Sequence, residues 1–182
     1  MNLKIILEFE GGYLRPLRPV DVHLDYISGL NDQEVNRYLE VAKHIPQTEQ
    51  SVSEFVRSNQ KSFDALLFGI WRTGDNRHCG TIRLHQIEYF HKTAYVGVCL
   101  FDKSTWGNKL GSKVIKAVTR WALETLGLHW IEAGIYTENI ASQRAFLAAG
   151  YEWVYDISGK YVFEGKPTIV KIFAARRVSF PQ

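Results

Sequence analysis

Residues 101–112 have the sequence Phe101-Asp102-Lys103-Ser104-Thr105-Trp106-Gly107-Asn108-Lys109-Leu110-Gly111-Ser112 and lead from a strand-like run into an amphipathic helix. Apolar residues recur at spacings of three and four from Leu110 to Thr125, and Gly127 supplies a C-terminal stop. The first N–H groups of a helix have no partner within it and lie at its positive end, so such a start suits an anion such as phosphate. The lysines at 103, 109 and 113 add positive charge. Taken alone, the segment is better explained as an ordinary helix start, because it matches neither a Walker loop nor a dinucleotide fingerprint.

A second informative segment follows the next strand-like run, residues 129–136. It begins at Asn139, continues as a helix-favouring stretch to Ala149 and ends at Gly150-Tyr151. Asn is favoured at a helix N-cap and Gly after a helix end, so stability alone explains both residues. Helix stability does not explain why this helix directly follows a strand beside the first loop. Together the two segments indicate a ligand site more strongly than either does alone.

The chain has 182 residues, which at ~150 residues per domain predicts one domain. Strands are expected at residues 13–18, 66–72, 79–87, 94–101, 129–136, 151–157 and 168–175, and helices at 20–29, 33–38, 49–63, 110–126 and 140–149. Tight turns predict an antiparallel meander over 66–101, followed by a strand-helix-strand unit. We therefore expect an α/β (α+β) fold, with a mixed, mostly antiparallel sheet of about seven strands flanked by helices.

In this order and spacing, the two segments resemble the GNAT superfamily of N-acetyltransferases. The family's coenzyme motif, Gln/Arg-x-x-Gly-x-Gly/Ala at the start of a long helix, falls on residues 106–111. Its later signature, Asn-x-x-Ser/Ala followed by a helix and Gly-Phe/Tyr, falls on 139–142 and 150–151. Residues 30–38 look like the branch that includes the ribosomal-protein N-terminal acetyltransferases. The likeness implies a single N-acetyltransferase domain over residues 1–182, with its core at about 13–176, that moves an acetyl group from acetyl-CoA to a primary amine.

The resemblance also implies where acetyl-CoA, the co-substrate, would bind. Backbone groups at the strand end would hold the pantetheine arm and the thioester carbonyl, and N–H groups of the loop would hold the pyrophosphate. A later asparagine would hydrogen-bond the arm, and an arginine one turn further would help to hold the coenzyme. These residues are Cys99, Leu100, Phe101, Gly107, Asn108, Lys109, Leu110, Gly111, Ser112, Asn139 and Arg144.

Three residues depart from the family pattern. Trp106 replaces the leading Gln/Arg, and Lys109 replaces the middle glycine. A lysine there still donates its N–H and adds an ammonium for a phosphate, but it makes close approach of the ligand less assured. Phe146 stands where many relatives carry a tyrosine that protonates the leaving thiolate, and the resemblance offers Ser142 for that role instead. As a first-turn residue, Ser142 is equally well explained by a hydrogen bond to the Asn139 cap.

The general base is less defined. His85 and Glu88 lie on or just after a strand expected to line the cleft, and an ordinary His pKa of ~6.5 suits removal of an amine proton near neutrality. An exposed strand residue and a turn carboxylate are the simpler readings of these two. Glu132 faces away from Ile131 and Ala133 and is interpreted as a sheet carboxylate. An ordered water would also be able to carry the proton.

The acceptor stays open among a free amino acid, a polyamine, an antibiotic, an amino sugar and a protein N-terminus. The loose likeness of the early helical region favours two of these about equally: a nucleotide-linked amino sugar of a surface-polysaccharide pathway and a protein N-terminus. Four aromatic residues are candidates for its cleft, although core positions are the simpler explanation: Tyr26, Tyr38, Phe90 and Tyr95. Two other classes of function are a non-catalytic acyl-CoA-binding or sensor module and a plain phosphate binder. A homodimer is possible.

Composition narrows the setting. A content of 46% hydrophobic and 23% charged residues excludes wholesale disorder. The net charge of +3 is too small to indicate nucleic-acid binding, and no stripe of basic residues stands out in the sequence. No apolar run approaches the ~20 residues of a membrane span, and the N-terminus does not have the pattern of a signal peptide. Cys79 and Cys99 have no metal-ligand spacing and suit a reducing cytoplasm, so we expect a cytoplasmic protein without a metal.

Overall fold

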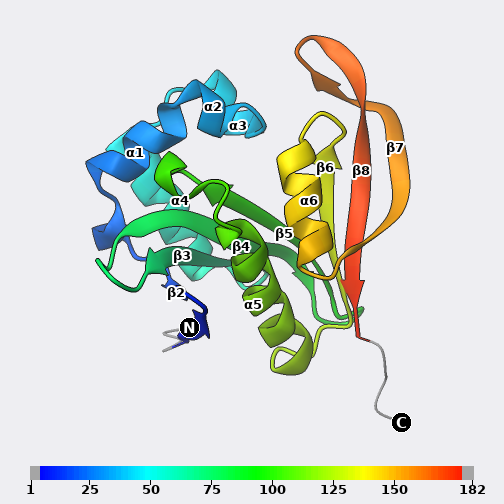
Figure 1. Cartoon of the computed structure of the whole chain (residues 1–182), viewed down its shortest axis with the longest axis horizontal. Coiled ribbons are helices and arrows are strands. Elements are labelled where there is room, and N and C mark those ends of the chain that lie inside the picture. The colour runs from blue at the N-terminus through cyan, green and yellow to red at the C-terminus, as the bar shows by residue number, and fades with distance from the viewer. Residues whose placement is uncertain (1–4, 178–182) are drawn as a thin grey trace.

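The computed structural model describes residues 5–177 as an eight-stranded sheet with helices on both faces (Figure 1). The strands lie in the order β1-β2-β3-β4-β5-β6-β8-β7. Their bounds are β1 Leu7–Phe9, β2 Gly12–Pro16, β3 Leu66–Arg72, β4 His78–Glu88, β5 Thr93–Leu100, β6 Trp130–Tyr136, β7 Glu152–Phe163 and β8 Lys166–Arg176. The helices are α1 Leu24–Asn31, α2 Gln33–Asn36, α3 Glu40–His44, α4 Glu49–Lys61, α5 Leu110–Glu124 and α6 Ile140–Ala148, with 3-10 turns at Pro19–Asp21 and Lys103–Thr105.

The strand pairing confirms the predicted mixed sheet. β5 and β6 run parallel, and the other neighbouring pairs are antiparallel. Parallel neighbours need a long connection, and α5 supplies it. β3, β4 and β5 form the predicted meander, and the last two strands pair with each other as expected. None of the helices within residues 5–177 is long and apolar enough to cross a membrane.

Three elements differ from the expectation. Residues 7–9 form an extra edge strand, which a turn at Gly11 (φ 91°) joins to β2, so the sheet has eight strands rather than about seven. Helix α3 is an additional short helix. The strand expected at 151–157 continues through Ser158-Gly159-Lys160 to Phe163 as β7, and its register against β8 shifts between Ser158 and Tyr161. A strand can absorb turn-favouring residues as an irregularity when its neighbour continues past them.

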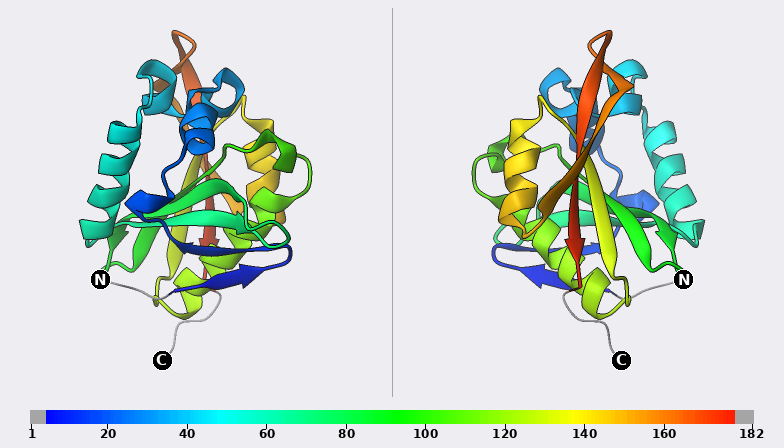
Figure 2. Two further views of the ribbon diagram at one scale, coloured as in Figure 1. Left: turned by 90° about the vertical axis from the view of Figure 1, so that its left-hand side faces the viewer. Right: turned by 90° about the vertical axis from the view of Figure 1, so that its right-hand side faces the viewer.

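Two apolar layers hold the helices on the sheet, and Figure 2 shows α4 and α6 on opposite sides of the strands. The first face, which carries Ala94 and Ile131, packs against α5 through residues such as Ile115, all of them buried. The second face, which carries Tyr95 and Glu132, is covered over β3 by α1 and α4, through Tyr26 and Val56 among others. Alternation of side chains along each strand produces this division.

β5 and β6 pair over three residues and then separate (Figure 1). The last pair is Tyr95 with Glu132. Beyond it, β5 pairs only with β4, and β6 pairs only with β8. The edge of β5 over residues 96–100 therefore has no strand partner, and we call it the open edge. Backbone groups on such an edge are available to a ligand or to water.

A histidine pair seats the start of α1 on the sheet. His23 Nδ1 accepts from the backbone N–H of Tyr26 as the helix N-cap, and His23 Nε2 lies 3.2 Å from His78 Nδ1. Because His23 accepts through Nδ1, the hydrogen-bond pattern assigns its proton to Nε2, which donates to His78. The His78 ring stacks on Trp71 with 4.5 Å between centroids. Burial, and then the neighbouring His23, lower the pKa of His78 to about 4.

This pair predicts a loss of stability in acid. The unfolded chain protonates His78 near pH ~6.5, whereas the folded protein resists until about pH 4, so the unfolded state gains the proton first as the pH falls. The free energy of unfolding should drop by about 3 kcal/mol on this account between pH 7 and pH 4. Urea unfolding of His78→Phe should show a shallower pH dependence than wild type. His91→Phe, at an exposed position between β4 and β5, is the control. Equal pH dependence in all three proteins would contradict the assignment.

Candidate active site

The start of α5 presents backbone donors, as predicted. The first bond of its ladder runs from Lys113 N to Lys109 O, so the N–H groups of Leu110, Gly111 and Ser112 have no partner within the helix. Lys109 is the N-cap and has a left-handed backbone, with φ 59°. A Cβ added to Gly111 would lie 3.7 Å from an atom of α6 and 3.8 Å from one of β5, so the start of α5 lies close to both elements.

The three lysines expected to add charge there differ in their partners. Lys103 Nζ binds Asp32 at 2.7 Å and Glu34 at 2.8 Å. Lys113 Nζ lies 3.2 Å from Glu10. Lys109 is exposed and has no ion-pair partner within residues 5–177, which also holds for Arg144 on α6. Lys109 and Arg144 are therefore the cations that remain available for a phosphate.

Trp106 ties this loop to the strand. Its indole Nε1 donates to the carbonyl oxygen of Leu100 at 3.0 Å. A residue that replaces the family's Gln/Arg thus fixes the loop against the end of β5. The Leu100 carbonyl, one of the groups expected to bind coenzyme, is engaged by this bond.

The open edge supplies the remaining donors of β5. The Cys99 carbonyl oxygen faces β4, since a Cβ on Gly80 would lie 2.4 Å from it, whereas the Leu100 carbonyl faces the loop. Because alternate residues of a strand direct their N–H and C=O groups to opposite sides, Val96 and Val98 present both groups on the open edge. The Phe101 carbonyl lies close to Gly29 of α1. The free carbonyls thus lie at Val96 and Val98, just before the predicted residues 99–101, and the N–H of Leu100 lies on the same side of the strand.

The start of α6 borders the same opening. Asn139 is the N-cap, and its Oδ1 accepts from the backbone N–H of Ser142 at 3.1 Å. Its amide nitrogen and the half-buried Ser142 hydroxyl have no hydrogen bond within the described part of the chain. Phe146 is buried edge-on against Tyr151, and the Tyr151 hydroxyl lies 2.8 Å from Thr119. Neither of these rings can protonate a leaving group at the opening.

Comparison with known proteins identifies this arrangement. Residues 13–152 match the family model described as acetyltransferase (GNAT) domain. The chain is 31% identical over 149 residues to YoaA of Bacillus subtilis strain 168, an uncharacterized N-acetyltransferase, with 81% of this chain and 82% of that protein covered. The chain belongs to the GNAT family of acetyltransferases. It is an N-acetyltransferase, as the resemblance implied.

Solved structures share the GNAT fold at low sequence identity. RimL, a ribosomal-protein acetyltransferase in complex with coenzyme A, superposes with a TM-score of 0.85 at 18% identity, over 94% of this chain and 98% of that one. A spermidine N-acetyltransferase from Vibrio cholerae, in complex with CoA and spermine, has a TM-score of 0.81 at 16% identity, over 91% and 95%. Both likenesses extend to the fold alone.

The two candidate bases of this GNAT chain have different environments. His85 pairs with Tyr95 across β4 and β5, and the two rings stack with 5.8 Å between centroids. Burial lowers the pKa of His85, so its imidazole is neutral near pH 7. Glu88 accepts from the backbone N–H of Phe90 at 3.0 Å, as expected of a turn carboxylate. It lies level with Thr93, about 17 Å along β5 from Val98, which does not suit a base acting there.

The four aromatic residues predicted for the acceptor cleft differ in their burial and in their position. Tyr26 is 2% exposed and stacks on Phe101 in the core, so it is not a cleft residue. Phe90 is exposed in the turn before β5. Tyr38 and Tyr95 lie on the side of the second face. Burial raises the pKa of Cys99 to about 12, so its thiol is no nucleophile at neutral pH.

The sequence predicted Tyr95 as a cleft residue but not the three further tyrosines that lie with it on the second face beside the open edge. These four, Tyr95, Tyr136, Tyr155 and Tyr161, form a row that we call the tyrosine wall. Burial is the largest cause that raises the pKa of Tyr95, Tyr136 and Tyr155, and Tyr161 adds a smaller electrostatic contribution to each. The strand register places all four side chains on the second face. Alternation along the last two strands was the available signal, but the irregularity in β7 hid it.

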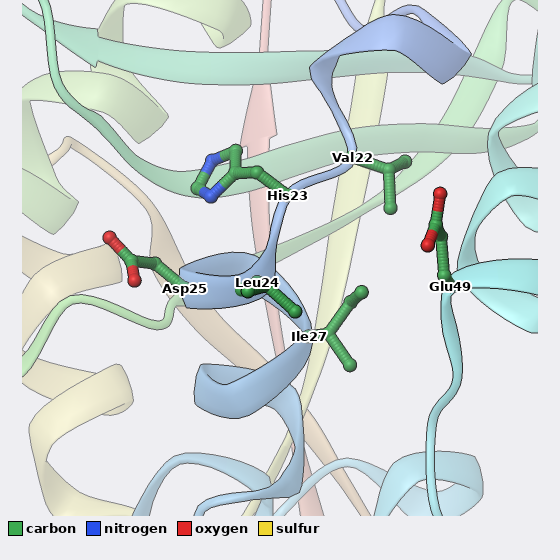
Figure 3. A pocket seen from close by; sticks show the side chains of 6 residues that line it. All are labelled: Val22, His23, Leu24, Asp25, Ile27 and Glu49. Carbon is green, nitrogen blue, oxygen red and sulfur yellow. The ribbon is translucent and has the colours of Figure 1, made fainter.

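Two hollows lie on the side of α1. The larger, about 490 Å³, lies at the starts of α1 and α4 (Figure 3) and is lined by Val22, His23, Leu24, Asp25, Ile27 and Glu49. The smaller, about 250 Å³, includes Phe101 and Lys103. Of the predicted site residues, only Phe101 lines either hollow. Within residues 5–177 no three His, Cys, Asp or Glu side chains gather as a metal site.

Lys109 offers a test that separates backbone strain from charge. Lys109→Gly should stabilise the protein by about 1 kcal/mol, because a left-handed backbone costs a non-glycine residue about that much. It should also weaken coenzyme binding several-fold in low salt, since the ammonium is lost. Lys92→Gly is the matched control, because Lys92 also has a positive φ, of 54°, and lies between β4 and β5. It should give the stabilisation alone. Urea unfolding and calorimetric titration measure the two effects, and unchanged coenzyme affinity in Lys109→Gly would exclude the charge role.

Proposed function

We propose that this GNAT member transfers the acetyl group of acetyl-CoA to a primary amine by direct attack in a ternary complex. One observation carries the proposal: the open edge of β5 leads directly to the free N–H groups at the start of α5. Residues 96–100 span about 13 Å, which gives an extended pantetheine arm a strand-like partner. The pyrophosphate then lies at residues 107–112, with Lys109 and Arg144 as counter-charges.

The open edge also suits the chemistry. The amine nitrogen attacks the thioester carbonyl, the new C–N bond forms, and the C–S bond breaks with the electron pair going to sulfur. In this proposal the N–H of Val98 hydrogen-bonds the oxyanion that develops on the carbonyl oxygen. Ser142 donates a proton to the thiolate, and Asn139 holds the coenzyme arm. The proton of the amine leaves through water to the neutral imidazole of His85.

The cysteines of the chain bear on the cell compartment in which it works, and the named relatives bear on its acceptor amine. Cys79 and Cys99 are both free thiols, which suits the reducing cytoplasm, where acetyl-CoA is also available. The acceptor is a primary amine, for which an amino sugar and a protein N-terminus are both candidates. RimL and the Vibrio enzyme are named for a ribosomal protein and for spermidine, so the fold accommodates very different amines.

Binding is the first test. Isothermal titration should show acetyl-CoA and CoA binding in preference to ATP, because the open edge recognises the pantetheine arm that ATP lacks. Turnover of acetyl-CoA with a panel of primary amines then tests transfer. Equal binding of ATP would reduce the site to a phosphate binder, and tight acetyl-CoA binding without turnover would identify a sensor module instead.

Ser142 is tested separately. Ser142→Ala should lower kcat by about 100-fold at saturating acetyl-CoA, the size of a general acid contribution, with little change in KM. Ser58→Ala is the control, because Ser58 lies on the exposed side of α4 and bonds its own helix through the Phe55 carbonyl. An unchanged kcat in Ser142→Ala would remove this residue from the mechanism.

A further inference from the structure

A short helical segment bridges the two strands that separate. It comprises residues 32–44, which include α2 and α3, and we call it the strap. β5 and β6 separate after Tyr95 and Glu132, and the strap contacts the segments that follow both strands. In Figure 1, α2 and α3 lie at the same end of the molecule as the tip of the β7–β8 hairpin. The strap therefore spans the gap beyond the point where β5 and β6 part.

One end of the strap is bound to the turn that precedes α5. Lys103 in that turn donates through Nζ to Asp32 at 2.7 Å and to Glu34 at 2.8 Å. Asp32 is also the N-cap of α2, since its other oxygen accepts from the backbone N–H of Glu34 at 2.9 Å. One carboxylate thus orders the start of the strap and fixes it to the segment that leads into residues 107–112, where the pyrophosphate is proposed to lie.

The other end of the strap is bound to β6 and to the residue before α6. The Tyr38 hydroxyl donates to the carbonyl oxygen of Glu138 at 3.1 Å, and Glu138 directly precedes Asn139, the N-cap of α6. The Tyr136 hydroxyl, at the end of β6, donates to Glu40 at 2.7 Å. The strap thus contacts both of the segments that lead into the proposed coenzyme site.

Tyr38 also reaches the side on which the acceptor is proposed to bind. Its ring stacks on Phe163 of β7, with 5.2 Å between centroids and 15° between ring planes. Phe163 in turn lies 5.3 Å from the ring of Tyr136, which belongs to the tyrosine wall. Arg37 pairs with Glu164 next to Phe163, at 3.2 Å. A single side chain of the strap, Tyr38, therefore joins the start of α6 to the tip of the hairpin.

The strap is firmly held inside and weakly held outside. Asn36 is buried, and its amide donates to the carbonyl oxygens of Leu30 at 3.1 Å and Ala42 at 3.3 Å, which joins α2 to both neighbouring helices. The ion pairs at the two ends are exposed, since the side chains of Lys103 and Arg37 are 43% and 50% exposed. Exposed ion pairs contribute little to stability, so the strap can leave the sheet as one unit.

We propose that the strap couples coenzyme binding to the acceptor side, with Lys103 and Tyr38 as positioning residues. Pyrophosphate at residues 107–112 steadies the turn that carries Lys103, and this turn holds the strap through its two carboxylate contacts. The docked strap keeps Tyr38 against the hairpin tip, so the acceptor amine meets an ordered surface once acetyl-CoA is bound. The coupling rests on the proposed function, because it takes the coenzyme to bind at the start of α5.

Backbone hydrogen exchange with and without CoA tests this coupling. The N–H groups of Asn36, Leu39 and Lys43 donate to backbone carbonyls within the strap. Helices of four and five residues do not persist alone, so these amides report whether the strap is docked. CoA should slow their exchange by about fivefold or more, the usual range of coupling between two sites. Exchange at residues 107–112 should slow as well.

Lys103→Met breaks the first end of the strap. The substitution keeps the aliphatic stem, removes both ion pairs and leaves the Asp32 cap in place. CoA should still protect residues 107–112, whereas its protection of the strap should fall below about twofold. By linkage, calorimetric titration should show CoA affinity lowered about fivefold. Lys116→Met, at an exposed position of α5, is the control for loss of a surface charge and should match wild type in the protection of the strap.

Tyr38→Phe breaks the second end. The ring that stacks on Phe163 is kept, and only the hydroxyl that binds the Glu138 carbonyl is lost. A change in packing alone would alter exchange equally with and without CoA, whereas loss of coupling reduces the difference between the two. We expect the difference for the strap to fall below about twofold. Tyr89→Phe is the control, because Tyr89 is exposed between β4 and β5.

The outcomes separate the coupling from the proposed function. Protection of residues 107–112 by CoA without any change in the strap would overturn the coupling and leave the coenzyme site standing. Protection of neither segment would overturn the coenzyme site, and the coupling with it. Protection of the strap that persists in both variants would overturn the assignment of Lys103 and Tyr38. Weaker CoA binding in Lys103→Met with full protection of the strap would instead show that Lys103 binds the coenzyme directly and would overturn its positioning role.

Discussion

The site of this acetyltransferase depends on a strand ladder that stops early. β5 and β6 are the parallel pair of the sheet, and they share three residue pairs before they separate. A continued ladder would have satisfied the backbone groups of Val96 and Val98 within the sheet, and no ligand would find a donor there. Both apolar layers and the crossover α5 hold the two halves of the sheet at this separation, so the core defines the opening without contributing side chains to it.

Local patterns predicted most of the fold, because most elements carry their own signal. Helix α5 has a regular apolar stripe, and the meander alternates clearly between short turns. β1 escaped notice because three residues are too few to show alternation, and its order comes from pairing with β2. The predicted strand ends at residue 157 because Ser158 and Gly159 favour turns locally, whereas pairing with β8 extends β7 past them. In each case a tertiary contact overrode a weak local preference.

The candidate site was predictable where the backbone makes it and not where distant side chains meet. The start of α5 and the Asn139 cap are visible in sequence because helix ends have strong residue preferences. The engagement of Lys103 by Asp32 and Glu34 is not visible, since about seventy positions separate the partners. For the same reason the tyrosine wall, which joins β5, β6 and β7, needed the folded sheet to become apparent.

The two edge strands of the sheet affect how readily the protein aggregates in a crowded solution. An edge strand with a regular row of free N–H and C=O groups invites another chain to add to it. One edge here, β1, is three residues long, and the other, β7, has register shifts near Trp153 and again near Ser158. An incoming strand would find only short regular stretches on either side. The irregularity that places Tyr155 and Tyr161 beside the opening therefore also acts against aggregation through the sheet.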